Sequence, residues 1–370
     1  AHGAEVQTVS VSEPSHDAYS SNDLIFDPAT KAQPYGLPFC TDYLTAQQSD
    51  KPGRVFEFVR SKVLAFKPDY IFLEHPWLWP AVQKMIGDGE IDRQKTKIVY
   101  SSHNLESATK KSILLELGLE PGSVDSVTSD IHALEQSLCL AADWVVCVTE
   151  TDAKALRSIG ASRVTVCPNG VAKRSADPEL LNQVNKLFYG RKYLIYIGSA
   201  YPPNAAGFWE LMGPSLAMFN PDEAIALVGG LSDIVDHYAP PEALMSSYVN
   251  GQILKKFGKV SDEVLEALIY GASGFILPIM SGGGSNLKTA EAIASGLPIV
   301  ASPVAMRGYE QFVGLQGLEV AADRSEFVHA ALRILRTDQN KQSDKKDELE
   351  RRSTVYWEHT LTNLQAVVAS

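Results

Sequence analysis

The sequence predicts an α/β protein of two Rossmann-like domains, each a parallel sheet covered by helices on both faces. Short runs rich in β-branched and aromatic residues alternate with segments of helical periodicity almost throughout the 370 residues. A polar, proline-containing stretch near 172–190 interrupts the alternation, which then restarts. The chain is 45% hydrophobic and long enough to form two separate cores. These observations favour two sheets over one large sheet.

The first domain is predicted to span residues 1–172. A helix is expected over 53–66, where Val55, Phe58 and Val59 recur at helical spacing, and Pro68 disfavours helical geometry beyond it. The polar opening of the chain leads straight into a strand-like run. We therefore expect that this domain's first strand and glycine turn are missing from the sequence. The strand candidates are 5–11, 69–74, 97–102, 143–148 and 163–168.

The second domain is predicted to span residues 187–352. The remaining segment, 353–370, is predicted to be a single helix, because Trp357, Leu361, Leu364 and Val368 fall on one side at helical spacing. Such an apolar stripe needs another surface to cover it. The strand candidates of this second series are 192–198, 223–229, 251–258, 274–279 and 297–302.

Composition excludes several classes of protein. The formal net charge of −11 argues against a nucleic-acid binder, and the 21% of charged residues is ordinary for a folded protein. No apolar stretch reaches the roughly 20 residues that span a bilayer, and no signal peptide is visible. We expect a soluble cytoplasmic protein, at most resting on a membrane surface. Its cysteines are expected to be buried reduced thiols: Cys40, Cys139, Cys147 and Cys167.

The segment 278–302 carries the clearest chemical signal. A buried-type strand is followed by three glycines and a helix that starts near Ser285, with Ser285 or Asn286 as its cap. Glycine backbone and a helix amino terminus together suit a phosphate group. Lys288 in the first turn opposes the helix dipole unless an anion binds there. A structural glycine loop with a Lys288–Glu291 ion pair is the alternative.

Several motifs, taken in order, resemble the retaining glycosyltransferases of the GT-B fold, family 4 in particular. The segment GGGSNLKTAEAIASGLPIVAS resembles that family's donor-site signature, and the stretch 143–171 ends in Pro-Asn-Gly-Val like its domain junction. Further matches are IVYSSHNLE at 98–106, the segment 258–278, and YWE at 356–358. The resemblance implies two domains facing across a cleft, with the last helix crossing back to pack on the first domain.

The resemblance also implies roles for individual residues. Glu291 would bind the nucleotide ribose, and His103 would contact the transferred sugar and support catalysis together with Lys288. His103 capping a turn with Asn104 is the alternative. His75 and Asn104 would lie on the acceptor side, although aromatic core packing around Trp77 and Trp79 is equally compatible with the pattern. The remaining donor-binding candidates are Gly198, Lys259, Val260, Gly283, Gly284, Ser285, Asn286 and Leu287.

Two departures from the family pattern concern the donor site. Gly283 stands where the family's first motif glutamate is usual. Ser199 and Pro203 stand near the positions where the family often supplies an arginine and a lysine to the diphosphate. Lys288 is therefore expected to carry the phosphate-binding charge.

The predicted function is retaining transfer of a hexosyl group from a nucleotide-diphosphate sugar to a hydroxyl of a glycan or lipid-linked acceptor. Neither a metal nor a cofactor is expected to take part. Polysaccharide biosynthesis and contact with the inner face of the membrane are further expectations of the resemblance. Two other classes remain open: a sugar-nucleotide epimerase or hydrolase of the same fold, and a non-catalytic nucleotide-sugar-binding protein.

Overall fold

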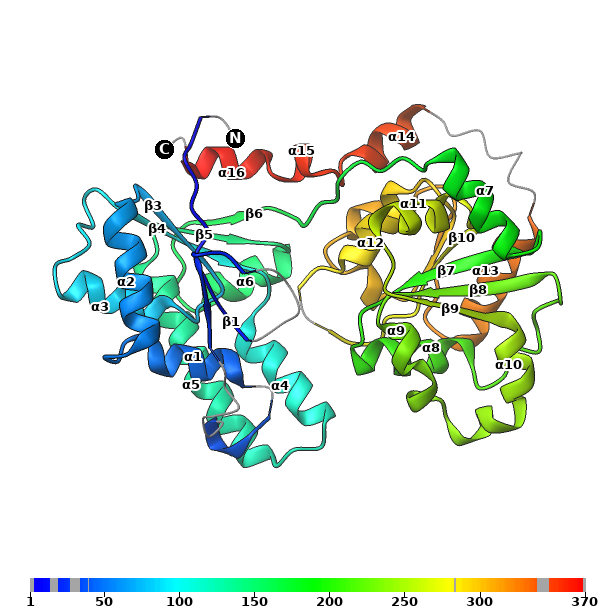
Figure 1. The fold of residues 1–370 in the computed structure, drawn as a ribbon, viewed down its shortest axis with the longest axis horizontal. Coiled ribbons are helices and arrows are strands. Elements are labelled where there is room, and N and C mark those ends of the chain that lie inside the picture. The colour runs from blue at the N-terminus through cyan, green and yellow to red at the C-terminus, as the bar shows by residue number, and fades with distance from the viewer. Residues whose placement is uncertain are drawn as a thin grey trace. The chain divides into compact units, whose positions relative to one another are not determined.

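The computed structural model describes residues 3–13, 19–26, 34–38, 40–282, 284–337 and 346–368. It forms two compact units: residues 1–166 with 367–370, and residues 167–366. Figure 1 shows that each unit contains a parallel sheet flanked by helices. The strand predictions at 69–74, 97–102, 143–148 and 163–168 match strands of the first unit, and those at 192–198, 223–229, 274–279 and 297–302 match strands of the second.

The first unit is organised around a four-stranded parallel sheet in the order β3-β4-β5-β6. These strands are Tyr70–Glu74, Lys97–Ser102, Trp144–Cys147 and Val164–Val166. Its helices are α1 (Thr41–Ser49), α2 (Arg54–Phe66), α3 (Trp79–Gly87), α4 (Glu106–Glu116), α5 (Pro121–Ala141) and α6 (Glu150–Ser158), with a 3₁₀ turn at Pro34–Gly36. The helix predicted over 53–66 is confirmed as α2, and it ends at Lys67 in the left-handed conformation, φ 52°.

The amino-terminal strand is shorter than predicted. Of the run 5–11, only its end is a strand: β1 covers Ser10–Ser12 and pairs in parallel with β2, Asp23–Ile25. Among the described residues this pair is a sheet of its own, separate from β3–β6. Alternation of apolar and polar residues fits an extended chain, but a strand also needs a hydrogen-bonding neighbour, and no described strand pairs with residues 5–9.

The second unit has a six-stranded parallel sheet in the order β12-β11-β10-β7-β8-β9. The strands are β7 (Lys192–Ile197), β8 (Glu223–Val228), β9 (Leu254–Gly258), β10 (Gly274–Leu277), β11 (Ile299–Ala301) and β12 (Leu318–Val320). The helices are α7 (Pro178–Leu187), α8 (Pro202–Met212), α9 (Leu231–Ile234), α10 (Ser247–Ile253), α11 (Asp262–Tyr270), α12 (Leu287–Ala294), α13 (Arg324–Arg336), α14 (Lys346–Ser353) and α15 (Trp357–Thr360). The last helix, α16 (Thr362–Val368), begins in this unit, and its end belongs to the first unit. Its 3₁₀ turns are Val235–Tyr238, Pro241–Ser246, Val304–Met306 and Glu310–Phe312.

Two hydrophobic cores lie on opposite faces of this sheet. One gathers Phe188, Phe275 and Ile293 with α7, α11 and α12, and the other gathers Phe208 and Phe327 with α8 and α13. Helices on both faces require strands that are apolar on both sides, and all six residues of β8 are accordingly buried.

Two predictions for this unit are wrong in detail. The run 251–258 begins as the end of α10 and becomes strand only at Leu254. The single helix predicted over 353–370 is interrupted, because Val171 forms a parallel bridge with Tyr356. The amide of Val171 donates to the carbonyl of Val355 at 3.0 Å, and the amide of Trp357 donates back at 3.2 Å. These bonds hold Tyr356 extended, so α15 starts afresh at Trp357.

All four cysteines are free and buried, as predicted. In the part of the chain that the structure describes, no helix is both long and apolar enough to cross a bilayer.

Candidate active site

The order of strands in the second unit reverses between β7 and β10, which lie side by side although β8 and β9 come between them in the sequence. Parallel sheets bind their ligands outside the carboxyl ends of the strands at such a reversal. Here the two loops at that point are 198–201, which leads into α8, and 278–286, which leads into α12. The glycine-rich segment predicted to bind phosphate therefore lies where the fold favours a ligand.

An arginine that the sequence analysis missed supports the glycine-rich loop. Arg307 follows the 3₁₀ turn Val304–Met306 and donates hydrogen bonds to the carbonyls of Gly282 and Gly284. Both glycines have positive φ, 134° and 59°, a conformation that other residues avoid. The guanidinium thus ties down the carbonyl side of the loop. Gly283 lies outside the described residues.

The helix that follows the loop has no side-chain cap. α12 begins at Leu287, and its N-cap residue Asn286 forms no capping hydrogen bond; its Nδ2 instead donates to the carbonyl of Val304 at 3.2 Å. Ser285 Oγ accepts from Nδ2 of Asn169 at 2.9 Å. The prediction that Ser285 or Asn286 caps the helix is therefore wrong, because both side chains are drawn to other segments. Among the described residues, no side chain accepts a hydrogen bond from the first amides of α12.

Lys288 extends from the first turn of α12 towards α8. Its Nζ donates to Oδ1 of Asn204 at 2.6 Å and lies 5.8 Å from the ring centroid of Tyr196. Asn204 is buried, and its Nδ2 donates to the carbonyl of Ser199 at 3.1 Å. Burial lowers the pKa of Lys288 from 10.5 to about 8. Through Asn204, the side chain of Lys288 thus links the first turn of α12 to the 198–201 loop.

Glu291 pairs with a second cation that the sequence analysis missed. Nη2 of Arg174 donates to Oε1 of Glu291 at 2.8 Å, and Nη1 lies 3.7 Å from Glu266 and 3.8 Å from Asp262. The alternative of a Lys288–Glu291 pair is therefore wrong, since each side chain has a different partner. Arg174 comes from the irregular segment before α7, which gave no signal beyond its polarity. A small pocket beside this pair is lined by Val171, Ala172, Arg174, Ile269, Tyr270, Glu291, Ala294, Ser295 and Tyr356.

The remaining donor-side candidates lie on neighbouring loops. Gly198 follows β7, and a Cβ there would lie 3.1 Å from Cβ of Leu231, so close packing already accounts for this glycine. Lys259 and Val260 follow β9; the lysine is exposed and the valine packs partly against the core. Gly284 is buried, whereas Leu287 is half exposed.

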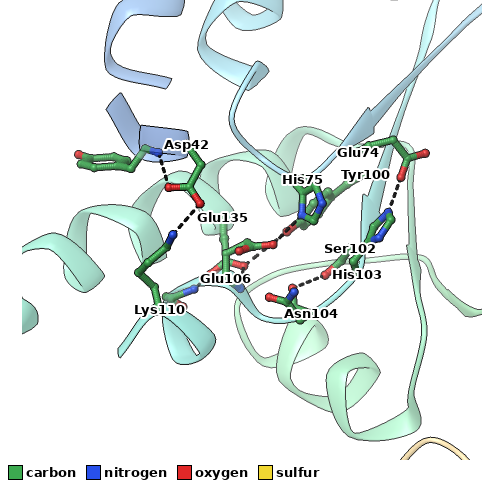
Figure 2. A network of polar contacts seen from close by, with 12 residues as sticks. Asp42, Glu74, His75, Tyr100, Ser102, His103, Asn104, Glu106, Lys110 and Glu135 are labelled. Carbon is green, nitrogen blue, oxygen red and sulfur yellow. Dashed lines mark hydrogen bonds and ion pairs between the residues drawn. The ribbon is translucent and has the colours of Figure 1, made fainter. Parts of the chain in front are cut away.

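Two histidines lie together at the carboxyl ends of β3 and β4 in the first unit (Figure 2). The imidazole centroids of His75 and His103 are 4.5 Å apart, tilted by 32°. Nε2 of His103 is 2.6 Å from Oε2 of Glu74, and Nδ1 of His75 is 2.6 Å from Oε1 of Glu106. The alternative in which His103 caps a turn with Asn104 is not what the structure shows, because the ring bonds Glu74 instead.

The environment of these pairs sets their charge. Burial is the largest influence on the pKa of His75 and lowers it, but the hydrogen bond to Glu106 and the nearby charges of Glu106, Glu74 and Asp42 outweigh burial, so the pKa is raised. Glu74 shows the mirror effect: burial raises its pKa, yet the bonds to His103 and Ser101 and the nearby imidazoles lower it overall. The Glu106 carboxylate thus favours the protonated form of the His75 imidazole.

A buried layer supports the histidine pairs. The Glu135 carboxylate, fully buried, accepts the amides of Glu106 at 2.7 Å and Ser107 at 3.0 Å. It thereby satisfies the amino terminus of α4, and burial raises its pKa. Ser102 Oγ donates to the carbonyl of Asn104 at 2.9 Å, while Oδ1 of Asn104 is buried without a hydrogen bond from any described residue.

Other features of the first unit lie apart from this edge. Trp79 is a core residue whose Nε1 donates to Ser137 at 3.1 Å, which fits the alternative of aromatic core packing at this position. A cavity of about 430 Å³ opens at the amino ends of the strands and contains none of the predicted site residues; it is lined by Tyr70, Lys97, Ala142, Asp143, Trp144, Ser162 and Arg163. Among the described residues, no cluster of His, Cys, Asp and Glu is arranged to hold a metal ion.

Two Rossmann-like units, one with a glycine-rich loop and lysine at its strand-order reversal, define a GT-B fold, and solved structures agree. Sucrose-phosphate synthase from Thermosynechococcus elongatus is similar at TM-score 0.69 and 17% identity, over 97% of this chain and 87% of that one. HepE from Anabaena, in complex with UDP, is similar at TM-score 0.63 and 15% identity, over 85% of this chain and 81% of that one. A UDP-forming trehalose-phosphate synthase from Burkholderia xenovorans, in complex with glucose-6-phosphate, is similar at TM-score 0.62 and 15% identity, over 86% of this chain and 76% of that one.

The family itself follows from the sequence. Residues 32–173 match the model of Glycosyltransferase Family 4, and residues 191–337 match that of glycosyl transferases group 1. The chain therefore belongs to the family 4-like glycosyltransferases of the GT-B fold. No curated protein sequence matches it.

Proposed function

We propose that the protein transfers a hexosyl group, with retention of configuration, from a nucleotide-diphosphate sugar to a hydroxyl of a glycan or lipid-linked acceptor. The observation that carries the proposal is the loop at the β7–β10 reversal, where α12 begins without a side-chain cap from Asn286 and carries Lys288 in its first turn. A diphosphate is the group that such a loop binds best. That HepE was solved with UDP, and trehalose-phosphate synthase with a sugar phosphate, supports the choice of donor.

In this proposal, the second unit holds the leaving group. As the bond between the sugar and the diphosphate breaks, negative charge grows on the phosphate oxygens. Lys288 and the α12 amides stabilise that charge from fixed positions, so little reorganisation is needed during the reaction. The carboxylate of Glu291 accepts hydrogen bonds from the ribose hydroxyls, and Arg174 keeps it oriented.

The first unit supplies the acceptor side in this proposal. His103, oriented by Glu74, contacts the transferred sugar. The acceptor oxygen forms the new bond on the face from which the diphosphate leaves, and its proton passes to a departing phosphate oxygen. This route needs no metal ion and no covalent intermediate on a carboxylate.

A thermal-shift screen against UDP, GDP, ADP, CMP and their sugar conjugates tests the donor site. A ligand at a hundredfold excess over its Kd stabilises the native state by about 2.7 kcal/mol. We expect one nucleotide class to shift the transition, and Glu291→Ala to abolish that shift. The exposed Glu242 provides the matched control, because Glu242→Ala changes net charge equally without touching the site.

Product analysis then tests the reaction. We expect sugar transfer only when an acceptor is present. Conversion of the donor without any acceptor would favour an epimerase or hydrolase. Nucleotide binding with no turnover across a panel of acceptors would indicate a non-catalytic binding protein.

A further inference from the structure

The charges around the histidine pairs are unbalanced. Four carboxylates meet there, from Asp42, Glu74, Glu106 and Glu135, against a single ammonium from Lys110 and the two imidazoles (Figure 2). Among the described residues that form this network, negative charge therefore exceeds positive charge even when both imidazoles are protonated.

The single ammonium is already used within the network. Nζ of Lys110 lies 2.6 Å from Oδ2 of Asp42, and only 10% of the lysine side chain is exposed. Lys110 is thus neutralised and largely out of reach of a ligand. Among the described residues of this network, the only other basic groups are the two imidazoles, and each is already paired with a carboxylate.

The groups that solvent reaches are mainly hydrogen-bond acceptors and imidazoles. The exposed fraction of the side chain is 58% for Glu74, 46% for His103, 34% for His75 and 33% for Asp42. Carboxylates accept hydrogen bonds from hydroxyl groups but repel phosphates and other carboxylates, and this repulsion grows as water is displaced from the site. The edge therefore suits a ligand that carries many hydroxyls and no negative charge.

We propose that this edge binds an uncharged, polyhydroxylated acceptor, a neutral glycan, and discriminates against phosphorylated or carboxylated sugars. The inference rests on the proposed function, because it names the class of acceptor that the first unit receives. Glu74 has two tasks here: it orients His103 and, with Asp42, it supplies the negative charge that rejects an anion. Asp42 also keeps the Lys110 ammonium from attracting one.

Histidine NMR on the full chain tests this inference without any need for the donor. The resonances of His75 and His103, assigned with His75→Gln and His103→Gln, are followed during titration with matched sugars. The pairs are methyl glucoside against glucose 6-phosphate, and methyl mannoside against mannose 6-phosphate. We expect the neutral member to shift the resonances at a concentration at least about tenfold lower than its phosphorylated partner.

Asp42→Asn provides the decisive variant, because it removes one carboxylate and with it the ion pair that Lys110 forms with Asp42. The ratio between the concentrations of phosphorylated and neutral sugar that shift the resonances should fall at least about fivefold. Asp125→Asn is its matched control: Asp125 pairs with Lys111, the neighbour of Lys110, at 2.8 Å, and belongs to no part of the histidine network. That control should leave the ratio unchanged.

The inference is overturned if the phosphorylated sugar binds as well as its neutral partner, if Asp42→Asn and Asp125→Asn act alike, or if no sugar shifts either histidine. These outcomes are separate from failure of the proposed function. If no nucleotide sugar binds or turns over but the preference for neutral sugars is observed, the proposed transferase activity is wrong, whereas the inferred carbohydrate site is supported. If sugar transfer occurs without a preference for neutral acceptors, only the present inference is wrong.

Discussion

Arg174 and Glu291 form an ion pair in which Nη2 of the arginine donates to Oε1 of the glutamate at 2.8 Å. The carbonyl of Arg174 in turn accepts the hydroxyl of Tyr270 at 2.8 Å, so the segment before α7 is fastened to α11 as well as to α12. The carboxylate that we assign to the ribose is therefore held in one orientation by a residue 117 positions away in the sequence.

Arg174→Gln should lower the free energy of unfolding by about 1–3 kcal/mol, because it leaves the partly buried Glu291 carboxylate beside Glu266 without its cation. Glu291→Gln alone and the double variant complete a cycle that isolates the interaction between the two side chains. Urea unfolding followed by circular dichroism measures all four proteins. Strictly additive losses would contradict the coupling.

Lys288 should make nucleotide binding depend on pH. Burial lowers its pKa to about 8, so the ammonium that attracts a diphosphate is lost as the pH rises through that value. Calorimetric affinity for the best nucleoside diphosphate should therefore fall between pH 7 and 9, by up to about tenfold per unit above the pKa. Lys288→Arg, which stays charged, should flatten this profile.

The same shift has a stability consequence of known sign. Between pH 8 and 10.5 the unfolded chain holds a proton on Lys288 that the folded chain has lost, so this group makes the protein more stable as pH rises in that window. Lys288→Ala should remove the effect and reduce turnover about tenfold or more. Wild-type kinetics in Lys288→Ala would rule out the assigned role.

Glu74→Gln should impair catalysis more than donor binding. The substitution keeps the shape of the side chain but removes the charge that holds His103 at 2.6 Å. We expect kcat to fall about tenfold or more, the scale of a displaced catalytic group, with little change in nucleotide affinity. Glu90→Gln is the matched control, since Glu90 pairs with Arg60 within the same unit. Equal kinetics for the two variants would argue against a role for Glu74.

Replacing either of two glycines of the second unit by alanine should change the stability of the protein, but in opposite directions. At Gly207 in α8, a Cβ would lie 2.4 Å from the carbonyl oxygen of Pro278, so Gly207→Ala should cost about 1–3 kcal/mol of stability. At Gly251 in α10, no heavy atom lies within 4 Å, so Gly251→Ala should stabilise the helix by up to about 1 kcal/mol. Thermal denaturation of both variants checks the pair, and a shift in the same direction would refute the packing argument.

Local patterns in the sequence were sufficient for most of the fold. The run 97–102 is strand β4 over the same residues, and 53–66 is helix α2 to within one residue. A parallel sheet that is buried on both faces requires continuous apolar runs, and a helix requires an apolar stripe at helical spacing. Both patterns can therefore be recognised from residues that are close together in the sequence. The predictions failed at 251–253 and at 354–356, where a helix end and a bridge to Val171 decide the structure.

The partners of charged side chains were decided only by the tertiary structure. In the sequence, Lys288 and Glu291 lie about one helical turn apart, which suggests an ion pair. In the structure, Lys288 instead donates to Asn204, 84 residues away, and Glu291 accepts from Arg174. Likewise, nothing in the sequence joins His103 to Glu74 or Arg307 to the glycine-rich loop. Backbone conformation follows from local sterics and periodicity, whereas a long flexible side chain takes whichever partner the packing of distant segments brings within reach.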